Sequence, residues 1–304
     1  MNPKPAWFRP VLSIRGCVSI LSVAFFAFAA HHCHRGYQQC RPARLRATAE
    51  EASRAKLLFP SLTELVVQSA DNLGLKAWYV APRNGACIVL VPGLGGNRAS
   101  MLDEAEVFAR HGYGALLLEP RAHGDSGGST ATWGTLEADD VIRAVKLAYA
   151  QTGVTSVGAL GFSVGASAVA LAAARDPSIR AVVLYATWTS LREEILHKTP
   201  HHWRLSALFT AWGYELAGAH LDSIVPEREL KRVSPRPILL LSGGRDEDTP
   251  PAIMDRVLAA CGSPSELWRL PSVGHGGYLQ AGPDEYERRV VGFWDRAFAK
   301  ATTP

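Results

Sequence analysis

A serine between two glycines is the feature of this sequence with the clearest potential for chemistry. It lies in Gly161-Phe162-Ser163-Val164-Gly165, between a strand predicted over 157–161 and a helix predicted over 164–175. A serine hydroxyl is a weak nucleophile unless a turn presents it to a base. The two glycines favour such a turn, because the positions beside the serine must approach other backbone closely. The segment therefore predicts Ser163 as a nucleophile.

A carboxylate and a histidine follow later in the chain, each just after a predicted strand. The loop Gly243-Gly244-Arg245-Asp246-Glu247-Asp248 follows the strand over 238–241, and Gly274-His275-Gly276 follows the strand over 266–270. Parallel strands bring their carboxyl ends to one edge of a sheet, so Ser163, an acid near position 246 and His275 can meet there. His275 fits the chain order serine, acid, histidine, whereas His123 precedes the serine.

The elements that must position these side chains alternate along the chain from residue 62 onward. Short apolar runs separated by longer amphipathic stretches are typical of an α/β fold with a mostly parallel sheet flanked by helices. Unbroken apolar runs suit strands that are buried on both faces. We predict eight strands, over 62–69, 76–80, 87–91, 115–118, 157–161, 181–185, 238–241 and 266–270, and helices over 98–111, 136–151, 164–175, 251–261 and 284–299.

An insertion separates the sixth predicted strand from the seventh. Residues 188–234 contain Trp188, Trp203, Phe209 and Trp212 and are predicted to be helical. Ligands of open α/β sheets bind beyond the carboxyl ends of the strands, so an insertion at this edge covers such a site. The aromatic side chains either form the insertion's own core or also line a substrate pocket, and the sequence leaves both readings open.

Composition and charge exclude several classes of protein. With 47% hydrophobic and 20% charged residues, the chain has the composition of a globular protein. Its net charge of +4 comes from residues 1–46, which hold seven basic and no acidic side chains, while the rest holds 25 basic and 28 acidic ones. We therefore expect no nucleic-acid partner. No metal-binding or dinucleotide-binding spacing is present, so we expect no metal and no cofactor.

The first 46 residues have the order of an export or anchoring segment. Lys4 and Arg9 precede an apolar stretch over 11–30 that only Arg15 interrupts. The fifteen uncharged residues over 16–30 match a signal-peptide core. The longer stretch approaches the ~20 residues of a spanning helix if Arg15 extends toward the head groups. We predict a signal peptide or membrane anchor over 1–46, hence an exported or membrane-anchored protein, and a single domain over 47–304. Cleavage and orientation remain open.

Four sequence blocks together resemble the α/β-hydrolase fold family over about residues 60–300. Two of them are Val91-Pro92-Gly93-Leu94-Gly95-Gly96-Asn97 after the third predicted strand and Glu119-Pro120-Arg121-Ala122-His123-Gly124-Asp125-Ser126 after the fourth. The serine turn and the acid and histidine loops complete the set. Within the family, the chain is most similar to membrane-anchored, lid-bearing serine esterases and peptidase-like hydrolases. This resemblance implies a serine hydrolase whose lid is the insertion over 188–234.

The resemblance also implies roles for single residues. Ser163 would be the nucleophile, His275 the general base and then acid, and Asp246 the carboxylate that orients the imidazole, with Asp248 as its near rival. The backbone N–H groups of Leu94 and Val164 would form the oxyanion hole.

The expected function is therefore hydrolysis of an ester, thioester or amide through an acyl-enzyme intermediate, in the manner of a carboxylesterase. The aromatic insertion favours a hydrophobic acyl or aryl group, so a small or lipid-like acyl substrate is expected. Two alternatives remain. The same residues would serve an acyltransferase if a lid excluded water. A membrane-tethered binding protein without activity would also fit, because a fold alone does not prove catalysis.

Overall fold

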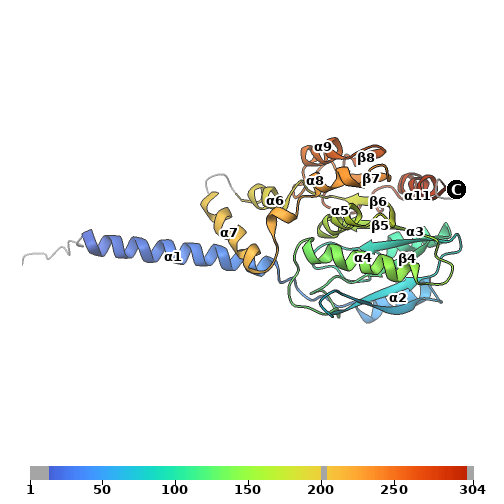
Figure 1. Cartoon of the computed structure of the whole chain (residues 1–304), viewed down its shortest axis with the longest axis horizontal. Coiled ribbons are helices and arrows are strands. Elements are labelled where there is room, and N and C mark those ends of the chain that lie inside the picture. Colours follow the sequence, from blue (N-terminus) through green and yellow to red (C-terminus); the bar gives the residue numbers. More distant parts are fainter. Residues whose placement is uncertain (1–13, 200–203, 300–304) are drawn as a thin grey trace, which may run out of the picture.

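A single eight-stranded sheet organises the computed structural model, which describes residues 14–199 and 204–299, without the side chains of residues 14–18. The strand order is β1-β2-β4-β3-β5-β6-β7-β8, and every pair from β4 to β8 is parallel, while β2 is antiparallel to both its neighbours (Figure 1). The prediction of eight strands in a mostly parallel sheet is confirmed. The strands are β1 Thr63–Gln68, β2 Gly74–Val80, β3 Ala86–Val91, β4 Gly114–Leu118, β5 Ser156–Phe162, β6 Ile179–Tyr185, β7 Ile238–Gly243 and β8 Ser265–Leu270.

Helices cover both faces of this sheet. The five predicted helices are present, although the first begins at residue 102 because the Asn97 side chain accepts the N–H of Ala99 and holds a turn there. The last prediction corresponds to α10 and α11 with a π-helical turn over 287–291 between them. The helices are α1 Ile14–Gln39, α2 Ala49–Leu58, α3 Leu102–Arg110, α4 Thr135–Tyr149, α5 Val164–Arg175, α6 Leu191–His197, α7 Arg204–Leu216, α8 Pro226–Leu230, α9 Pro251–Ala260, α10 Pro283–Tyr286 and α11 Gly292–Ala299.

Helix α2 was not predicted, although the residues at its start have the pattern of a helix N-terminus. The Thr48 hydroxyl accepts the N–H of Glu51, and the Glu51 carboxylate accepts the N–H of Thr48. This reciprocal pair is a capping box, which satisfies two N–H groups that a helix start leaves without partners. A threonine followed three residues later by glutamate therefore indicated a helix start.

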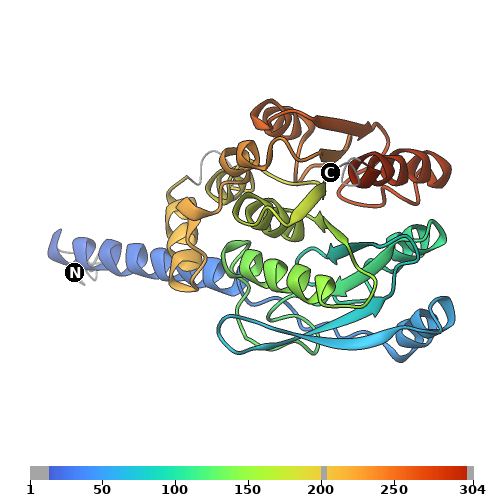
Figure 2. The same ribbon diagram turned by 45° about the vertical axis from the view of Figure 1, so that its right-hand side comes forward.

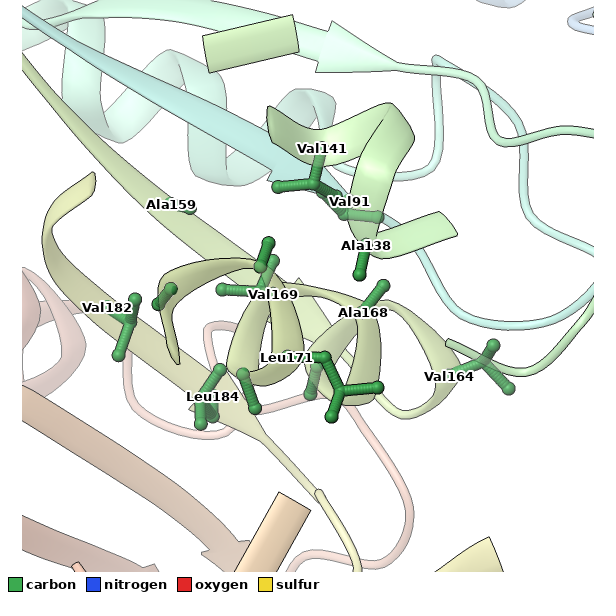
Figure 3. Packing of buried hydrophobic residues seen from close by; sticks show 14 of the residues in the cluster. Val91, Ala138, Val141, Ala159, Val164, Ala168, Val169, Leu171, Val182 and Leu184 are labelled. Carbon is green, nitrogen blue, oxygen red and sulfur yellow. The ribbon is translucent and has the colours of Figure 1, made fainter. Parts of the chain in front are cut away.

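The hydrophobic core lies on the two faces of the sheet and holds α5 tightly. All residues of α5 from Val164 to Ala173 are buried, and seven of these ten are glycine, alanine or serine. Figure 3 shows α5 between α4, represented by Ala138 and Val141, and strand residues such as Val182. Small side chains let the helix approach its neighbours closely, so its first turn has little freedom to move. The residue just before that turn is Ser163.

The insertion over 188–234 is helical, as predicted, and contacts α1. It contains α6, α7 and α8, and residues 200–203, which include Trp203, lie outside the described residues. In Figures 1 and 2, α7 lies across α1, whose first half extends away from the rest of the molecule. The Phe209 ring of α7 packs against Phe25 and Phe28 at centroid distances of 5.8 and 6.2 Å.

Helix α1 covers most of the predicted apolar stretch, and residues 1–13 lie outside the described part of the chain. Its exposed apolar side chains include Ile20, Leu21, Val23 and Phe26. Within the described residues, no helix combines the length and the hydrophobicity needed to cross a membrane.

Candidate active site

Ser163 occupies a strained turn between β5 and α5. Its backbone has φ 54° and ψ −115°, a conformation that non-glycine residues rarely adopt. A Cβ atom at Gly161 would lie 2.4 Å from the carbonyl oxygen of Gly165, and one at Gly165 would lie 2.3 Å from that of Val91. Only glycine fits at these two positions, which is the physical reason for the glycines on both sides of the serine.

A chain of hydrogen bonds joins Ser163, His275 and Asp246. The Oγ of Ser163 lies 3.0 Å from Nε2 of His275. On the other side of the ring, Nδ1 lies 2.9 Å from Oδ2 and 3.1 Å from Oδ1 of Asp246. Because a carboxylate accepts hydrogen bonds, Nδ1 carries the proton and Nε2 is left to accept the hydroxyl proton. The loops after β5, β7 and β8 supply the three side chains.

The neighbouring backbone fixes the carboxylate of Asp246. Its Oδ1 accepts the N–H groups of Asp248 and Thr249 at 2.9 and 2.8 Å, and the residue is only 3% exposed. A carboxylate held in this way has one orientation, and that orientation faces His275. The structure thus brings together Ser163, Asp246 and His275, three of the five residues selected from the sequence.

Asp248 has a different set of contacts. Its side chain is half exposed and forms an ion pair with Nζ of Lys198 at 3.1 Å. Partial burial raises the pKa of Asp248, but the hydrogen bond and charge of Lys198 outweigh burial and lower it overall. Lys198 also contacts Glu194 at 2.8 Å. Asp248 therefore links the acid loop to the end of α6, whereas Asp246 contacts the imidazole.

The remaining two residues, Leu94 and Val164, were predicted to offer backbone N–H groups to an oxyanion. Val164 is the first residue of α5, where the positive end of the helix dipole lies. The backbone of Gly93 beside Leu94 is near the ring of Phe162, since a Cβ there would lie 3.0 Å from that ring. Within the described residues, neither N–H donates a hydrogen bond to the protein. Of the two, the N–H of Val164 lies at a helix start, which favours a negatively charged oxygen.

A buried carboxylate supports the loop that carries Leu94. Glu119 is fully buried and accepts hydrogen bonds from Arg98 at 3.2 Å and from the N–H of Ser126 at 3.0 Å. It thereby joins the loop after β3 to the turn over 119–126. In the same turn, Nδ1 of buried His123 donates to the carbonyl of Arg121 at 2.7 Å, and burial lowers the pKa of His123. His123 thus has a structural contact of its own.

A cavity of about 340 Å³ is lined by Phe162 and Gly276, the chain neighbours of Ser163 and His275. Contrary to one reading of the sequence, no described residue of the insertion lines it. Trp188 instead packs in the core against Trp133 at 5.9 Å, and Trp212 is 56% exposed. The insertion and α1 line a second cavity of about 610 Å³. The first cavity is lined by Pro92, Gly93, Leu94, Gly96, Ser100, Met101, Asp103, Glu104, Phe162, Tyr185, Gly276, Gly277, Tyr278 and Gln280.

One group of side chains in the described part of the chain has a spacing that could hold a metal ion. Single ligand atoms of Asp246, Asp248 and His275 lie within 4.8 Å of one another. In this arrangement, however, Nδ1 of His275 already donates a proton to Asp246, and Asp248 is paired with Lys198. The hydrogen bonds account for these contacts without an ion.

Comparisons with known proteins agree with this fold. The family model described as alpha/beta hydrolase fold matches residues 87–218. An uncharacterized protein of Mycobacterium tuberculosis is 27% identical over 227 residues, which are 73% of this chain and 75% of that protein. Among solved structures, the Pyrococcus furiosus esterase Pf2001 has a TM-score of 0.69 at 22% identity, covering 84% of this chain and 98% of the esterase.

A second structural neighbour has a different named activity. A puromycin-hydrolyzing peptidase of Mycobacterium tuberculosis has a TM-score of 0.63 at 19% identity, covering 78% of this chain and 39% of the peptidase. Likeness at this level of identity concerns the fold. The family match and the two structures together show that this chain has the alpha/beta-hydrolase fold.

The turn at Ser163 yields a first prediction. Gly165→Ala places a Cβ atom 2.3 Å from the Val91 carbonyl oxygen, and neither backbone segment can move freely. We expect a loss of about 3 kcal/mol in the free energy of unfolding, measured by urea denaturation. The control is Gly282→Ala, whose Cβ would have its nearest neighbour at 3.9 Å and should cost less than about 0.5 kcal/mol. Equal stability of the two variants would show that the turn is not tightly packed.

Proposed function

We propose that this protein is a serine hydrolase that cleaves an ester, thioester or amide through an acyl-enzyme intermediate. The observation that carries the proposal is the hydrogen-bond chain from Ser163 through His275 to Asp246, with distances of 3.0 and 2.9 Å. The esterase and peptidase among the structural neighbours support a hydrolytic reaction. Under this proposal, Ser163 is the nucleophile, His275 the general base and acid, and Asp246 the orienting carboxylate.

The proposed reaction uses each contact of the site. Oγ of Ser163 attacks the carbonyl carbon while Nε2 of His275 takes the hydroxyl proton, and the imidazolium is stabilised by Asp246. The carbonyl oxygen becomes negative and accepts hydrogen bonds from the N–H groups of Leu94 and Val164. The imidazolium then gives its proton to the leaving oxygen, sulfur or nitrogen. Water, deprotonated by His275, releases the acid in a second cycle.

The cavity beside the serine supports an organic acyl or aryl group of modest size. Leu94, Met101 and Phe162 form an apolar wall, and the volume of about 340 Å³ lies at the lower end of the range for small-molecule sites. These apolar walls favour a carboxylesterase-like reaction on such substrates.

We also propose that the N-terminal segment attaches the protein to a membrane. Ile20, Leu21 and Phe26 of α1 are 58–70% exposed, and Leu216 of the adjacent α7 is 73% exposed. Soluble proteins rarely expose large contiguous apolar surfaces without a partner. A lipid surface is the partner that matches uncharged aliphatic and aromatic side chains. The insertion, as a lid, would then lie near this surface.

The role of Ser163 is tested by ester turnover. We expect the full chain to hydrolyse p-nitrophenyl butyrate and Ser163→Ala to lose at least about a thousandfold in kcat/KM, because the nucleophile is removed. Ser167→Ala is the matched control, since Ser167 lies one turn further along α5 and its buried hydroxyl hydrogen-bonds to none of the residues that the structure describes. Unchanged turnover in Ser163→Ala would contradict the proposal.

The choice between the two acids is tested by a pair of variants. Asp246→Asn removes the acceptor for Nδ1–H and favours the wrong tautomer of His275, so we expect kcat to fall about 10³- to 10⁴-fold. Asp248→Asn breaks the ion pair with Lys198 and leaves the hydrogen bond between Asp246 and His275 in place, so the expected change is less than about tenfold. The reverse order of effects would make Asp248 the orienting acid.

Membrane attachment is tested by sedimentation with lipid vesicles. We expect the full chain to sediment with the vesicles, and a variant with Leu21, Val23 and Phe26 all changed to serine to sediment less. The control changes Leu57 and Val66, exposed apolar residues on α2 and β1, to serine. Equal recovery of all three proteins in the supernatant would contradict the attachment.

A further inference from the structure

Glu104 is an acidic side chain in the wall of the cavity beside Ser163. It lies on α3, and its carboxylate makes no hydrogen bond or ion pair with another side chain of the described residues. Burial raises the pKa of Glu104 to about 7. The adjacent Asp103 differs, because it binds Arg54 and accepts a hydrogen bond from Gln280 at 2.9 Å. Glu104 is thus the carboxylate of this wall that lacks a counter-charge.

The rest of the cavity supplies hydroxyl groups and no positive charge. None of the described residues that line it is lysine, arginine or histidine. The hydroxyl of Tyr278 is buried near the backbone of Gly243 and Gly276, while that of Tyr185 hydrogen-bonds to Tyr286. Aromatic rings and a free carboxylate together are a favourable surrounding for an organic cation. The polar part of the cavity is therefore suited to a positively charged group.

The position of the cavity connects it with the reaction at Ser163. Three of its lining residues are Leu94, which offers a proposed oxyanion donor, Phe162, which precedes the serine, and Gly276, which follows the histidine. The cavity is thus built from the residues next to the serine and the histidine in the chain, so a group bound there lies on the same side of the molecule as the reacting atoms. The apolar wall of Leu94, Met101 and Phe162 lies in the same cavity as Glu104.

We propose that the cavity selects substrates that carry a protonated amine on a short apolar chain, with Glu104 as the counter-charge for that amine. The proposal rests on the proposed serine hydrolase function and names its substrate class. An ammonium group in the cavity gives the Glu104 carboxylate a counter-charge that no described side chain provides, and a neutral ligand of the same shape does not. Glu104 is accordingly a specificity-determining residue that does not touch the reacting atoms.

The test compares ligands of the same length with and without charge. n-Alkylammonium ions and the corresponding n-alkanols, with two to eight carbons, compete with hydrolysis of a neutral ester at about pH 8.5, where Glu104 is ionised. Binding of the same ligands is also followed by ligand-observed NMR, which requires no turnover. For the unchanged protein we expect at least one chain length at which the ammonium binds about tenfold more tightly than the alkanol.

Variants on one helix separate the role of Glu104 from a general effect of charge. Glu104→Gln keeps the shape of the side chain, and the ratio of alkanol Kd to ammonium Kd should fall close to one. Glu104→Asp keeps the charge and should retain part of this ratio. Glu106→Gln is the control, because Glu106 lies on the same helix outside this cavity. It should leave the preference unchanged. Thermal unfolding of each variant shows whether it is folded. If Glu104→Gln does not fold, Glu104→Asp provides the test.

The outcomes separate this inference from the proposed function. Equal binding of ammonium and alkanol at every length, or an equal preference in Glu104→Gln and Glu106→Gln, would overturn the role of Glu104 even if the neutral ester is hydrolysed. A preference for the ammonium that depends on Glu104 supports the cavity as an amine site even in a protein that hydrolyses no ester. Binding of this kind without any ester hydrolysis would contradict the proposed hydrolase function and leave the amine site standing.

Discussion

The hydrogen bond between Ser163 and His275 is the interaction on which the rest of this structure depends. It joins residues 112 positions apart in the chain, with Oγ and Nε2 separated by 3.0 Å. Such a contact forms only if the loops after β5 and β8 are held at the same edge of the sheet. The parallel register of β5, β6, β7 and β8 provides that, and the N–H groups of Asp248 and Thr249 fix the third partner, Asp246.

The strained backbone at Ser163 persists because its surroundings leave no alternative. The helix that follows is buried along ten consecutive residues, and the glycines on both sides approach backbone within distances that exclude a Cβ atom. Packing of this density prevents the turn from relaxing. The favourable free energy of packing in the core therefore offsets the cost of the unusual backbone conformation. The same packing holds the start of α5, and with it the N–H of Val164, in a fixed place directly after the serine.

The sequence predicted the parts of this molecule that depend on periodicity and chain order. Short apolar runs located all eight strands, of which the central ones are unbroken, and the order of serine, acid and histidine selected side chains that do meet. The resemblance favoured Asp246 but left Asp248 as a rival, because the two backbone N–H groups that hold the Asp246 carboxylate toward the ring come into place only in the folded loop. The cavity could not be predicted from the sequence either. Glu104 lies between Asp103 and Glu106 on an amphipathic helix, and only the tertiary packing leaves its carboxylate without a counter-charge among the described side chains.

Covalent trapping tests the central claim most directly. The full chain is treated with a fluorophosphonate, digested and examined by mass spectrometry to locate the adduct. Activation of the hydroxyl by His275 predicts one adduct per chain, on the peptide that contains Ser163, with the other serines unmodified. No adduct, or an adduct spread over several serines, would mean that the contact between Ser163 and His275 does not make a nucleophile.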